Sequence, residues 1–146
     1  MIEGGSYGGY VVLLGLTRQP GLWRAGVDLA GIVDLTSMLS GGGVPARYLT
    51  EFGDPVRDAA LIAAWSPLRD AGKIVAPIFI YQGLNDPRVP KAQADMMVRA
   101  LRAHHVPVEY MVPSNEGHTI ARRDNQVEYL SRIIRFLTDA LAAPHT

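Results

Sequence analysis

The hydrophobic positions of the chain fall into short continuous runs separated by segments with helical spacing. Apolar runs at residues 27–33 (VDLAGIV), 76–82 (APIFIYQ) and 106–112 (VPVEYMV) have the length and apolar character of strands buried on both faces. Residues 90–105 lie between the last two runs, and their apolar positions recur at helical intervals. The pattern therefore predicts strands that alternate with helices.

Glycine and proline divide the rest of the chain into shorter segments. An apolar run from Tyr7 to Leu16 follows a glycine-rich turn and ends before Gln19-Pro20-Gly21, which predicts a helix. We expect a loop over residues 36–43 (TSMLSGGG) and short helices over residues 44–52 and 58–64.

The C-terminal part of the chain predicts one further helix. Asp124 can cap its N-terminus. An apolar stripe, typical of a helix that packs on a core, is formed by Val127, Leu130, Ile134, Leu137 and Leu141.

An order of strand, helices, strand, helix, strand and helix predicts an α/β fold with a mostly parallel sheet flanked by helices. The length of 146 residues fits one domain. In such sheets, ligands bind beyond the carboxyl ends of the strands. Functional residues are therefore expected directly after strands.

The composition limits the classes of function. Hydrophobic residues make up 48% of the chain and charged residues 19%, which is typical of a globular domain. The formal net charge is zero, so bulk charge predicts neither a nucleic-acid partner nor an anionic membrane. The absence of cysteine excludes disulfides, thiolate metal sites and a cysteine nucleophile.

The sequence carries no sign of a membrane segment or a secretion signal. No apolar stretch reaches the roughly 18 residues that span a bilayer. The N-terminus lacks a basic segment followed by a long apolar core. We therefore expect no membrane partner and a cytoplasmic location.

Ser6 lies in Gly4-Gly5-Ser6-Tyr7-Gly8, which matches the G-x-S-x-G pattern of a nucleophile elbow. In that motif a tight turn from strand to helix holds the serine in a strained conformation. The residues two before and two after it are small, so that strand and helix can approach. Glycine-rich turns that hold a serine are common, so the motif alone does not establish a nucleophile.

Asp86 and His118 each follow a predicted strand. Asp86, in Gly83-Leu84-Asn85-Asp86-Pro87, is either a cap of the following helix or a carboxylate that orients a histidine. His118 lies in a loop at the functional end of the sheet. The other histidines lie at a predicted helix end or in the tail. The order serine, acid, histidine is that of the α/β-hydrolase triad, which favours the catalytic interpretation.

Two further charged residues near strand ends are given structural roles. Asp34 is expected to cap a helix or loop, and Arg88 is expected to brace the Asp86 loop by pairing or hydrogen bonding. No cluster of histidines with carboxylates indicates a metal site. The Gly4–Gly9 turn lacks the lysine of a phosphate-binding loop. We expect no cofactor and no metal.

On these residues the sequence resembles the C-terminal half of a prolyl oligopeptidase family catalytic domain, nearest its acylaminoacyl peptidase and dipeptidyl peptidase branches. The matching stretches are Gly4-Gly5-Ser6-Tyr7-Gly8-Gly9-Tyr10, Ser66-Pro67, Gly83-Leu84-Asn85-Asp86-Pro87-Arg88-Val89-Pro90, Asn115-Glu116-Gly117-His118 and Ile133-Ile134-Arg135-Phe136-Leu137.

The resemblance implies a role for each matching residue. Ser6 would be the nucleophile, and His118 would act as general base and then as general acid. Asp86 would orient His118, and the backbone N–H of Tyr7 would be one oxyanion donor. Residues 1–146 would form the C-terminal part of an α/β-hydrolase catalytic domain truncated at its N-terminal side.

The sequence also departs from the family pattern. Thr119 follows the histidine where the family often has glycine. No His-Gly-Gly stretch, which in the family supplies a second oxyanion donor, precedes Ser6, and the family's β-propeller is absent. An uncovered sheet edge would then favour self-association.

Three functions fit these residues. The chain is a serine peptidase that cleaves short or acylated peptides through an acyl-enzyme, a carboxylesterase on the same scaffold, or a catalytically incompetent fragment. The expected partner is a peptide or small acyl substrate.

Overall fold

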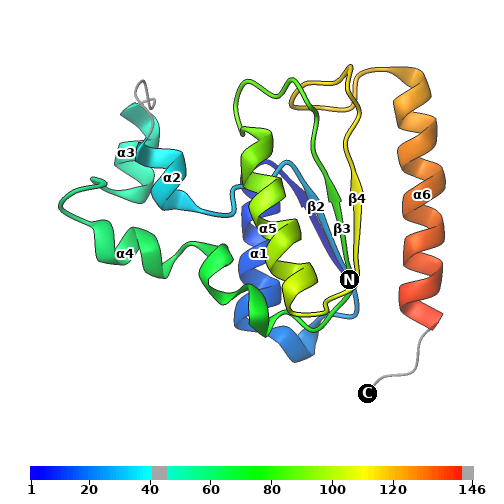
Figure 1. Ribbon diagram of the computed structural model, residues 1–146, viewed down its shortest axis with the longest axis horizontal. Coiled ribbons are helices and arrows are strands. Elements are labelled where there is room, and N and C mark those ends of the chain that lie inside the picture. The colour runs from blue at the N-terminus through cyan, green and yellow to red at the C-terminus, as the bar shows by residue number, and fades with distance from the viewer. Residues whose placement is uncertain (41–45, 143–146) are drawn as a thin grey trace.

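Four parallel strands run in the order β1-β2-β3-β4 through the computed structural model, which describes residues 1–40 and 46–142 (Figure 1). The strands are β1 (Ile2–Gly5), β2 (Gly26–Leu29), β3 (Ile78–Tyr81) and β4 (Val108–Met111). Every described pair of neighbouring strands is parallel, and consecutive strands lie side by side. The predicted α/β fold with a parallel sheet is confirmed.

Helices cover both faces of this sheet. In Figure 1, α6 lies alone on one face, α1 and α5 cover the other, and α2, α3 and α4 extend beyond them. The α-helices are α1 (Tyr7–Arg18), α2 (Leu35–Ser40), α3 (Ala46–Phe52), α4 (Ala59–Ala64), α5 (Lys91–Ala103) and α6 (Arg123–Ala142). Within the described ranges, 3-10 helices are formed by η1 (Pro20–Leu22) and η2 (Pro67–Lys73).

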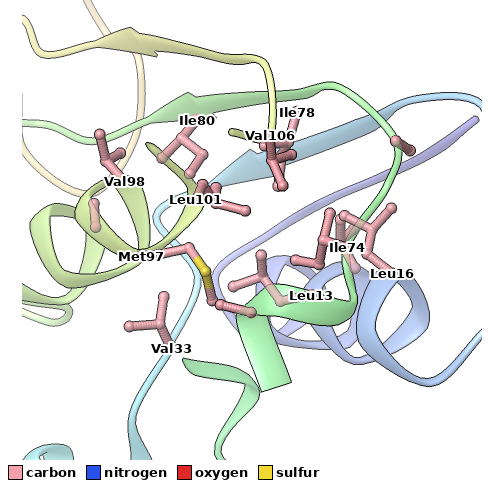
Figure 2. Close-up of a cluster of buried hydrophobic side chains, with 14 residues drawn as sticks. Leu13, Leu16, Val33, Ile74, Ile78, Ile80, Met97, Val98, Leu101 and Val106 are labelled. Carbon is pink, nitrogen blue, oxygen red and sulfur yellow. The ribbon is translucent and has the colours of Figure 1, made fainter. Parts of the chain in front are cut away.

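The hydrophobic core lies on both faces of the sheet because side chains alternate along each strand. Ile78 and Ile80 of β3 point toward α1 and α5, where Leu13 and Met97 are fully buried (Figure 2). The intervening Phe79 belongs to a second cluster. That cluster reaches α6 and includes Val27, Tyr81, Met111, Ile133 and Phe136. The sheet is therefore the middle of three layers.

Strand β2 is shorter than the predicted run of residues 27–33. It ends at Leu29 because Ala30 takes a positive φ of 55°. Ile32 and Val33 are still buried, but they lie in the loop that follows the strand. Burial in a loop and burial in a strand produce the same apolar pattern, so the pattern overestimated the length of the strand.

The prediction of a loop over residues 36–43 was wrong for its described part. Residues 35–40 form α2, and residues 41–43 lie outside the described ranges. Leu35 and Leu39 are buried one helical turn apart, and the Asp34 carboxylate accepts a hydrogen bond from the Ser37 N–H at 3.1 Å. The expected capping role of Asp34 is confirmed.

The predicted helices over residues 44–52 and 58–64 are found as α3 and α4. Helix α3 spans Ala46–Phe52, and residues 44 and 45 lie outside the described ranges. Helix α4 spans Ala59–Ala64 and begins directly after Asp58.

The predicted apolar face of α6 does not face the sheet. Ile133 and Phe136 are buried, whereas the apolar stripe of α6, Val127, Leu130, Ile134 and Leu141, is exposed. Leu137, the fifth predicted member, is half-buried. The helix begins at Arg123, so Asp124 lies in its first turn rather than at the cap. No described helix combines the length and apolar character needed to cross a membrane.

Candidate active site

The turn between β1 and α1 holds Ser6 in a strained backbone conformation. Its φ is 57° and its ψ is −118°, a combination that is costly for a residue with a side chain. The Ser6 N–H donates to the Leu29 carbonyl at 2.8 Å, and the Tyr10 N–H donates to the Ser6 carbonyl at 3.1 Å. Bonds to a neighbouring strand and to the first turn of α1 thus hold the strained residue in place.

Close backbone approach explains two of the glycines in this turn. A Cβ atom on Gly4 would lie 2.5 Å from the Gly8 carbonyl oxygen, so β1 and α1 can approach only if residue 4 is glycine. A Cβ atom on Gly9 would overlap the Asp28 carboxylate and would lie 2.8 Å from the Gly31 Cα. A Cβ atom on Gly8 would meet nothing within 4 Å. Of the two glycines that follow the serine turn, packing therefore requires Gly9 and not Gly8.

Ser6, His118 and Asp86 form one chain of hydrogen bonds. His118 Nε2 lies 2.9 Å from Ser6 Oγ, and His118 Nδ1 lies 2.7 Å from Asp86 Oδ2. The side chain of His118 is 10% exposed and that of Asp86 is fully buried. Three residues predicted from separate parts of the sequence are thus brought together at the carboxyl ends of β1, β3 and β4.

The carboxylate of Asp86 is held by hydrogen bonds within its own loop. Its Oδ1 accepts from the backbone N–H groups of Arg88 at 2.8 Å and Val89 at 3.1 Å. Its Oδ2 accepts from Gln82 Nε2 at 3.1 Å in addition to His118. These partners lie before α5 or outside it, so the described contacts do not make Asp86 a cap of that helix.

Arg88 braces the Asp86 loop through its backbone rather than its guanidinium. Its N–H is the group that donates to Asp86, and its side chain is exposed. Gln82, for which the sequence predicted no role, makes more hydrogen bonds within this loop than Arg88 does. Its amide nitrogen donates to Asp86, to the Val89 carbonyl and to the Gly83 carbonyl.

Glu116 organises the loop that carries His118. It is 3% exposed, and its carboxylate accepts from the backbone N–H groups of Ala121 and Arg122 and from Asn125 Nδ2. Burial raises the pKa of Glu116, but these three hydrogen bonds outweigh it and hold the pKa below its usual value. The carboxylate therefore ties both sides of the loop to the start of α6.

The backbone N–H of Tyr7 lies directly beside the serine. Tyr7 is the first residue of α1, and the first N–H groups of a helix have no acceptor within it. The positive end of the helix dipole also lies there. This amide is available to an oxygen that develops negative charge next to Ser6.

One cavity is lined by Tyr7, the residue after the serine, and another is lined by Ser6 itself. The first, of about 270 Å³, lies on the α1 side and includes Tyr7, Tyr10, Phe52, Leu61 and Trp65 in its walls. The second, of about 430 Å³, is called the histidine-side cavity, and its walls are Gly5, Ser6, Leu29, Tyr81, His118, Thr119 and Ile120. Only the second is lined by both Ser6 and His118.

Asp28 is a buried acid that sequence analysis did not detect. It lies in the middle of β2, is 1% exposed, and accepts a hydrogen bond from the Gly31 N–H at 2.9 Å. Burial raises the pKa of Asp28 to about 7, and the hydrogen bond from Gly31 opposes this only in part. The sequence pattern did not predict a buried acid here, because Asp28 stands alone in an apolar run. Its burial under the first turn of α1, beside Gly9, arises from the fold.

The described residues contain no group of three or more histidine, aspartate and glutamate side chains that could hold a metal ion.

The class of protein follows from the sheet and the serine turn together. A parallel sheet flanked by helices, with a strained serine between a strand and a helix, is the arrangement of the α/β-hydrolase fold. Solved structures of peptidases share this fold. A puromycin-hydrolyzing peptidase from Mycobacterium tuberculosis matches 97% of this chain and 22% of its own, with a TM-score of 0.89 and 29% identity. A second puromycin hydrolase structure matches with a TM-score of 0.89 and 26% identity.

The chain belongs to the prolyl oligopeptidase family, whose model matches residues 1–143. It is 40% identical over 149 residues to dipeptidyl aminopeptidase BIII of Pseudoxanthomonas mexicana, and this alignment covers 96% of the chain. It is 35% identical over 150 residues to dipeptidyl peptidase family member 6 of Caenorhabditis elegans, again over 96% of the chain. The matches cover 21% and 20% of these relatives, so the chain spans about a fifth of their length.

Proposed function

We propose that the protein is a serine peptidase that cleaves short or acylated peptides through Ser6, His118 and Asp86. The observation that carries the proposal is the unbroken chain of hydrogen bonds from Ser6 Oγ to the buried Asp86 carboxylate. Membership of a peptidase family supports the reaction class. The names of its relatives, dipeptidyl aminopeptidase and acylamino-acid-releasing enzyme, favour short or acylated peptides as substrates.

In the first step, Ser6 Oγ attacks the carbonyl carbon of the substrate. His118 Nε2, 2.9 Å away, takes the hydroxyl proton as the C–O bond forms. The carbonyl oxygen becomes an oxyanion that accepts a hydrogen bond from the Tyr7 N–H. When the tetrahedral intermediate collapses, the C–N bond breaks and His118 returns the proton to the departing amine. An acyl-enzyme on Ser6 remains.

In the second step, water hydrolyses the acyl-enzyme. His118 takes a proton from the water as its oxygen attacks the ester carbonyl, and then returns this proton to Ser6 Oγ. Asp86 keeps its negative charge throughout. Its hydrogen bond to Nδ1 fixes the tautomer that leaves Nε2 facing Ser6, and it stabilises the imidazolium that forms.

Paired substrates with a common acyl group test this function and separate it from that of a carboxylesterase. We expect hydrolysis of an aminoacyl p-nitroanilide that is lost in S6A and retained in S131A. Ser131 is an exposed serine on α6 whose hydroxyl donates to the Val127 carbonyl of the same helix at 2.8 Å. Hydrolysis of the matching p-nitrophenyl ester alone would favour the esterase. If the folded chain hydrolysed neither substrate, both the peptidase and the esterase hypothesis would be contradicted, and a catalytically incompetent fragment would be favoured.

We further propose that residues 1–146 correspond to the C-terminal part of a hydrolase catalytic domain and that a second oxyanion donor comes from outside them. The limited share of each relative that the chain matches supports this. Removal of one oxyanion donor costs about 10²–10³ in kcat in a comparable site. Fusion of the preceding catalytic-domain segment of dipeptidyl aminopeptidase BIII to this chain should raise kcat by that factor. An unchanged kcat in a folded fusion would contradict the proposal.

A further inference from the structure

Three acceptor oxygens surround the side-chain nitrogen of Gln82. This residue directly follows β3 and is fully buried. Its Nε2 lies 3.0 Å from the Val89 carbonyl oxygen, 3.1 Å from Asp86 Oδ2 and 3.3 Å from the Gly83 carbonyl oxygen. An amide nitrogen carries two hydrogens and an amide oxygen carries none, so the reverse orientation would set an oxygen against three acceptors. The fold therefore determines which way this amide points.

The oxygen of the same amide is left without a partner. Gln82 Oε1 is buried and accepts no hydrogen bond among the described residues. A buried acceptor without a donor destabilises a folded protein, so its retention requires an explanation. The donor end of the side chain provides one, because it contacts the Asp86 carboxylate.

Gln82 and His118 share one oxygen of Asp86. Asp86 Oδ2 accepts from Gln82 Nε2 at 3.1 Å and from His118 Nδ1 at 2.7 Å. The other oxygen, Oδ1, accepts from the backbone N–H groups of Arg88 and Val89. Each donor offsets part of the negative charge of the carboxylate. Because Gln82 donates to the oxygen that His118 contacts, it weakens the attraction of Asp86 for a proton on His118.

We propose that Gln82 is a positioning residue that sets the lower pH limit of the site: its hydrogen bond to Asp86 Oδ2 allows His118 to lose its proton at a lower pH. This inference rests on the proposed function, because only a neutral His118 can take the proton of Ser6. Without the Gln82 donor, the imidazolium would persist to higher pH, and fewer molecules would hold a base ready for Ser6.

The other charged groups around this network are accounted for. Burial raises the pKa of Glu116, but its hydrogen bonds outweigh this effect and hold the pKa below its usual value, so the carboxylate stays negative. Burial raises the pKa of Tyr81 to about 12, so the phenol stays neutral. The side chains of Arg88 and Arg122 are exposed and stay positive. Burial raises the pKa of Asp28 to about 7, but this residue is common to all the variants compared below.

NMR titration of His118 tests the proposal without turnover. Q82M keeps the approximate length of the side chain and removes the donor. The signal of His118 Cε1–H, identified by its absence in H118A, is followed through the pH range in which histidine titrates. The midpoint in Q82M should lie about 0.5–1 pH unit above that of the wild type, because a hydrogen bond to a charged group has been removed.

Gln93 provides the matched control. It is also a buried glutamine, 4% exposed, and its side chain makes four hydrogen bonds with residues 33–37 rather than with the Asp86 loop. Q93M should lower the Tm, as Q82M does, but leave the His118 midpoint unchanged. An equal shift of the midpoint in both variants would mean that it reports a general loosening of the fold, and would overturn the proposal.

The wild type provides a second measurement that does not depend on the folding of Q82M. Because Gln82 and His118 share Asp86 Oδ2, the Nε2–H signals of the Gln82 side chain should move with the same midpoint as His118 Cε1–H. Gln82 signals that stay constant while His118 titrates would overturn the proposal. An unchanged His118 midpoint in folded Q82M would do the same.

Labelling of Ser6 by a fluorophosphonate probe separates this inference from the proposed function. In Q82M the acidic limb of the labelling rate should move to higher pH, whereas a purely structural role would lower the rate by one factor at every pH. A protein that labels at Ser6 with the same acidic limb in both forms would retain the proposed function and lose this inference. If the His118 midpoint moves but Ser6 is not labelled, the effect of Gln82 on His118 is retained and the proposed function is contradicted.

Discussion

Gly8 and Gly9 both follow the serine, but their surroundings differ. An added Cβ on Gly9 would overlap the Asp28 carboxylate, whereas one on Gly8 would meet nothing within 4 Å. G9A should therefore destabilise the fold by about 1–3 kcal/mol through overpacking. G8A should be neutral or stabilising by up to about 1 kcal/mol, because alanine favours the helix more than glycine does. Denaturant unfolding of the two variants measures the difference. Equal losses would contradict the contacts assigned to Gly9.

The buried carboxyl of Asp28 predicts a pH dependence of stability. Its pKa is about 7 in the folded protein and near 3.8 in the unfolded chain. Its contribution is therefore fully present below about pH 4 and is lost as the pH rises to about 7, because only the unfolded state then ionises freely. One pKa unit corresponds to about 1.4 kcal/mol, so the loss amounts to a few kcal/mol.

D28N removes this titration at nearly constant shape. We expect its Tm to match that of the wild type near pH 4 and to exceed it above pH 7. The exposed Asp139 supplies the control, since D139N should show no such divergence. A constant Tm difference between D28N and the wild type across this range would contradict a neutral buried Asp28.

At the scale of elements, neighbouring isoleucines of α6 differ in their environment. Ile133 is 6% exposed and packs in the cluster around Phe79, whereas Ile134 is 63% exposed in the apolar stripe of α6. I133A should cost about 2–4 kcal/mol of unfolding free energy, and I134A at most about 0.5 kcal/mol. Chemical denaturation of both variants provides the comparison. The opposite order would mean that α6 docks through the face that the sequence predicted.

The sequence predicted the main strands and helices in their order, but it missed α2 and did not predict which face of α6 packs on the sheet. Strands β3 and β4 and helices α1 and α5 follow from apolar spacing, because each has its buried side encoded locally. Helix α6 offers two apolar faces, and only the position of Phe79 and Tyr81 on the sheet decides between them. Helix α2 was missed because its six residues lie in a serine- and glycine-rich stretch that is typical of a loop.

In the candidate site, too, the sequence predicted the residues that lie in motifs but not those whose role depends on packing. Ser6, Asp86 and His118 follow from motifs and from their order along the chain, and the structure places them within hydrogen-bond distance. Gln82 and Glu116 hold the loops of Asp86 and His118 in place, but the sequence predicted no role for either of them, although Glu116 lies in a stretch that resembles the family. Their importance arises from burial and from partners that the fold brings to them.

At the scale of the whole molecule, β1 is bonded on one side only among the described residues. It pairs with β2, and the N–H groups of Ile2 and Ser6 point toward that neighbour. In a parallel strand the alternate residues, Glu3 and Gly5, direct their backbone groups to the open side. The Tyr129 hydroxyl donates to Glu3, so a side chain of α6 reaches this edge, and the apolar stripe of the same helix is exposed.

We predict that two copies of the chain associate through the open β1 edge and the apolar stripe of α6, because unpaired edges and apolar patches both favour pairing. Sedimentation velocity over a range of concentrations should show a rising average mass. I134E should shift this toward the monomer, whereas V75E, at a residue 68% exposed and outside the stripe, should not. A concentration-independent monomer would contradict the prediction.

The most direct test of the account is the reactivity of Ser6 toward a fluorophosphonate probe. The hydrogen-bonded chain from Ser6 to Asp86 predicts that the folded protein is labelled at Ser6, as mapped by mass spectrometry of its peptides. The rate of labelling should fall by about 10²–10⁴ in H118A, because His118 takes the serine proton. Labelling at another serine, or equal rates in the wild type and H118A, would contradict the assignment of Ser6 as an activated nucleophile.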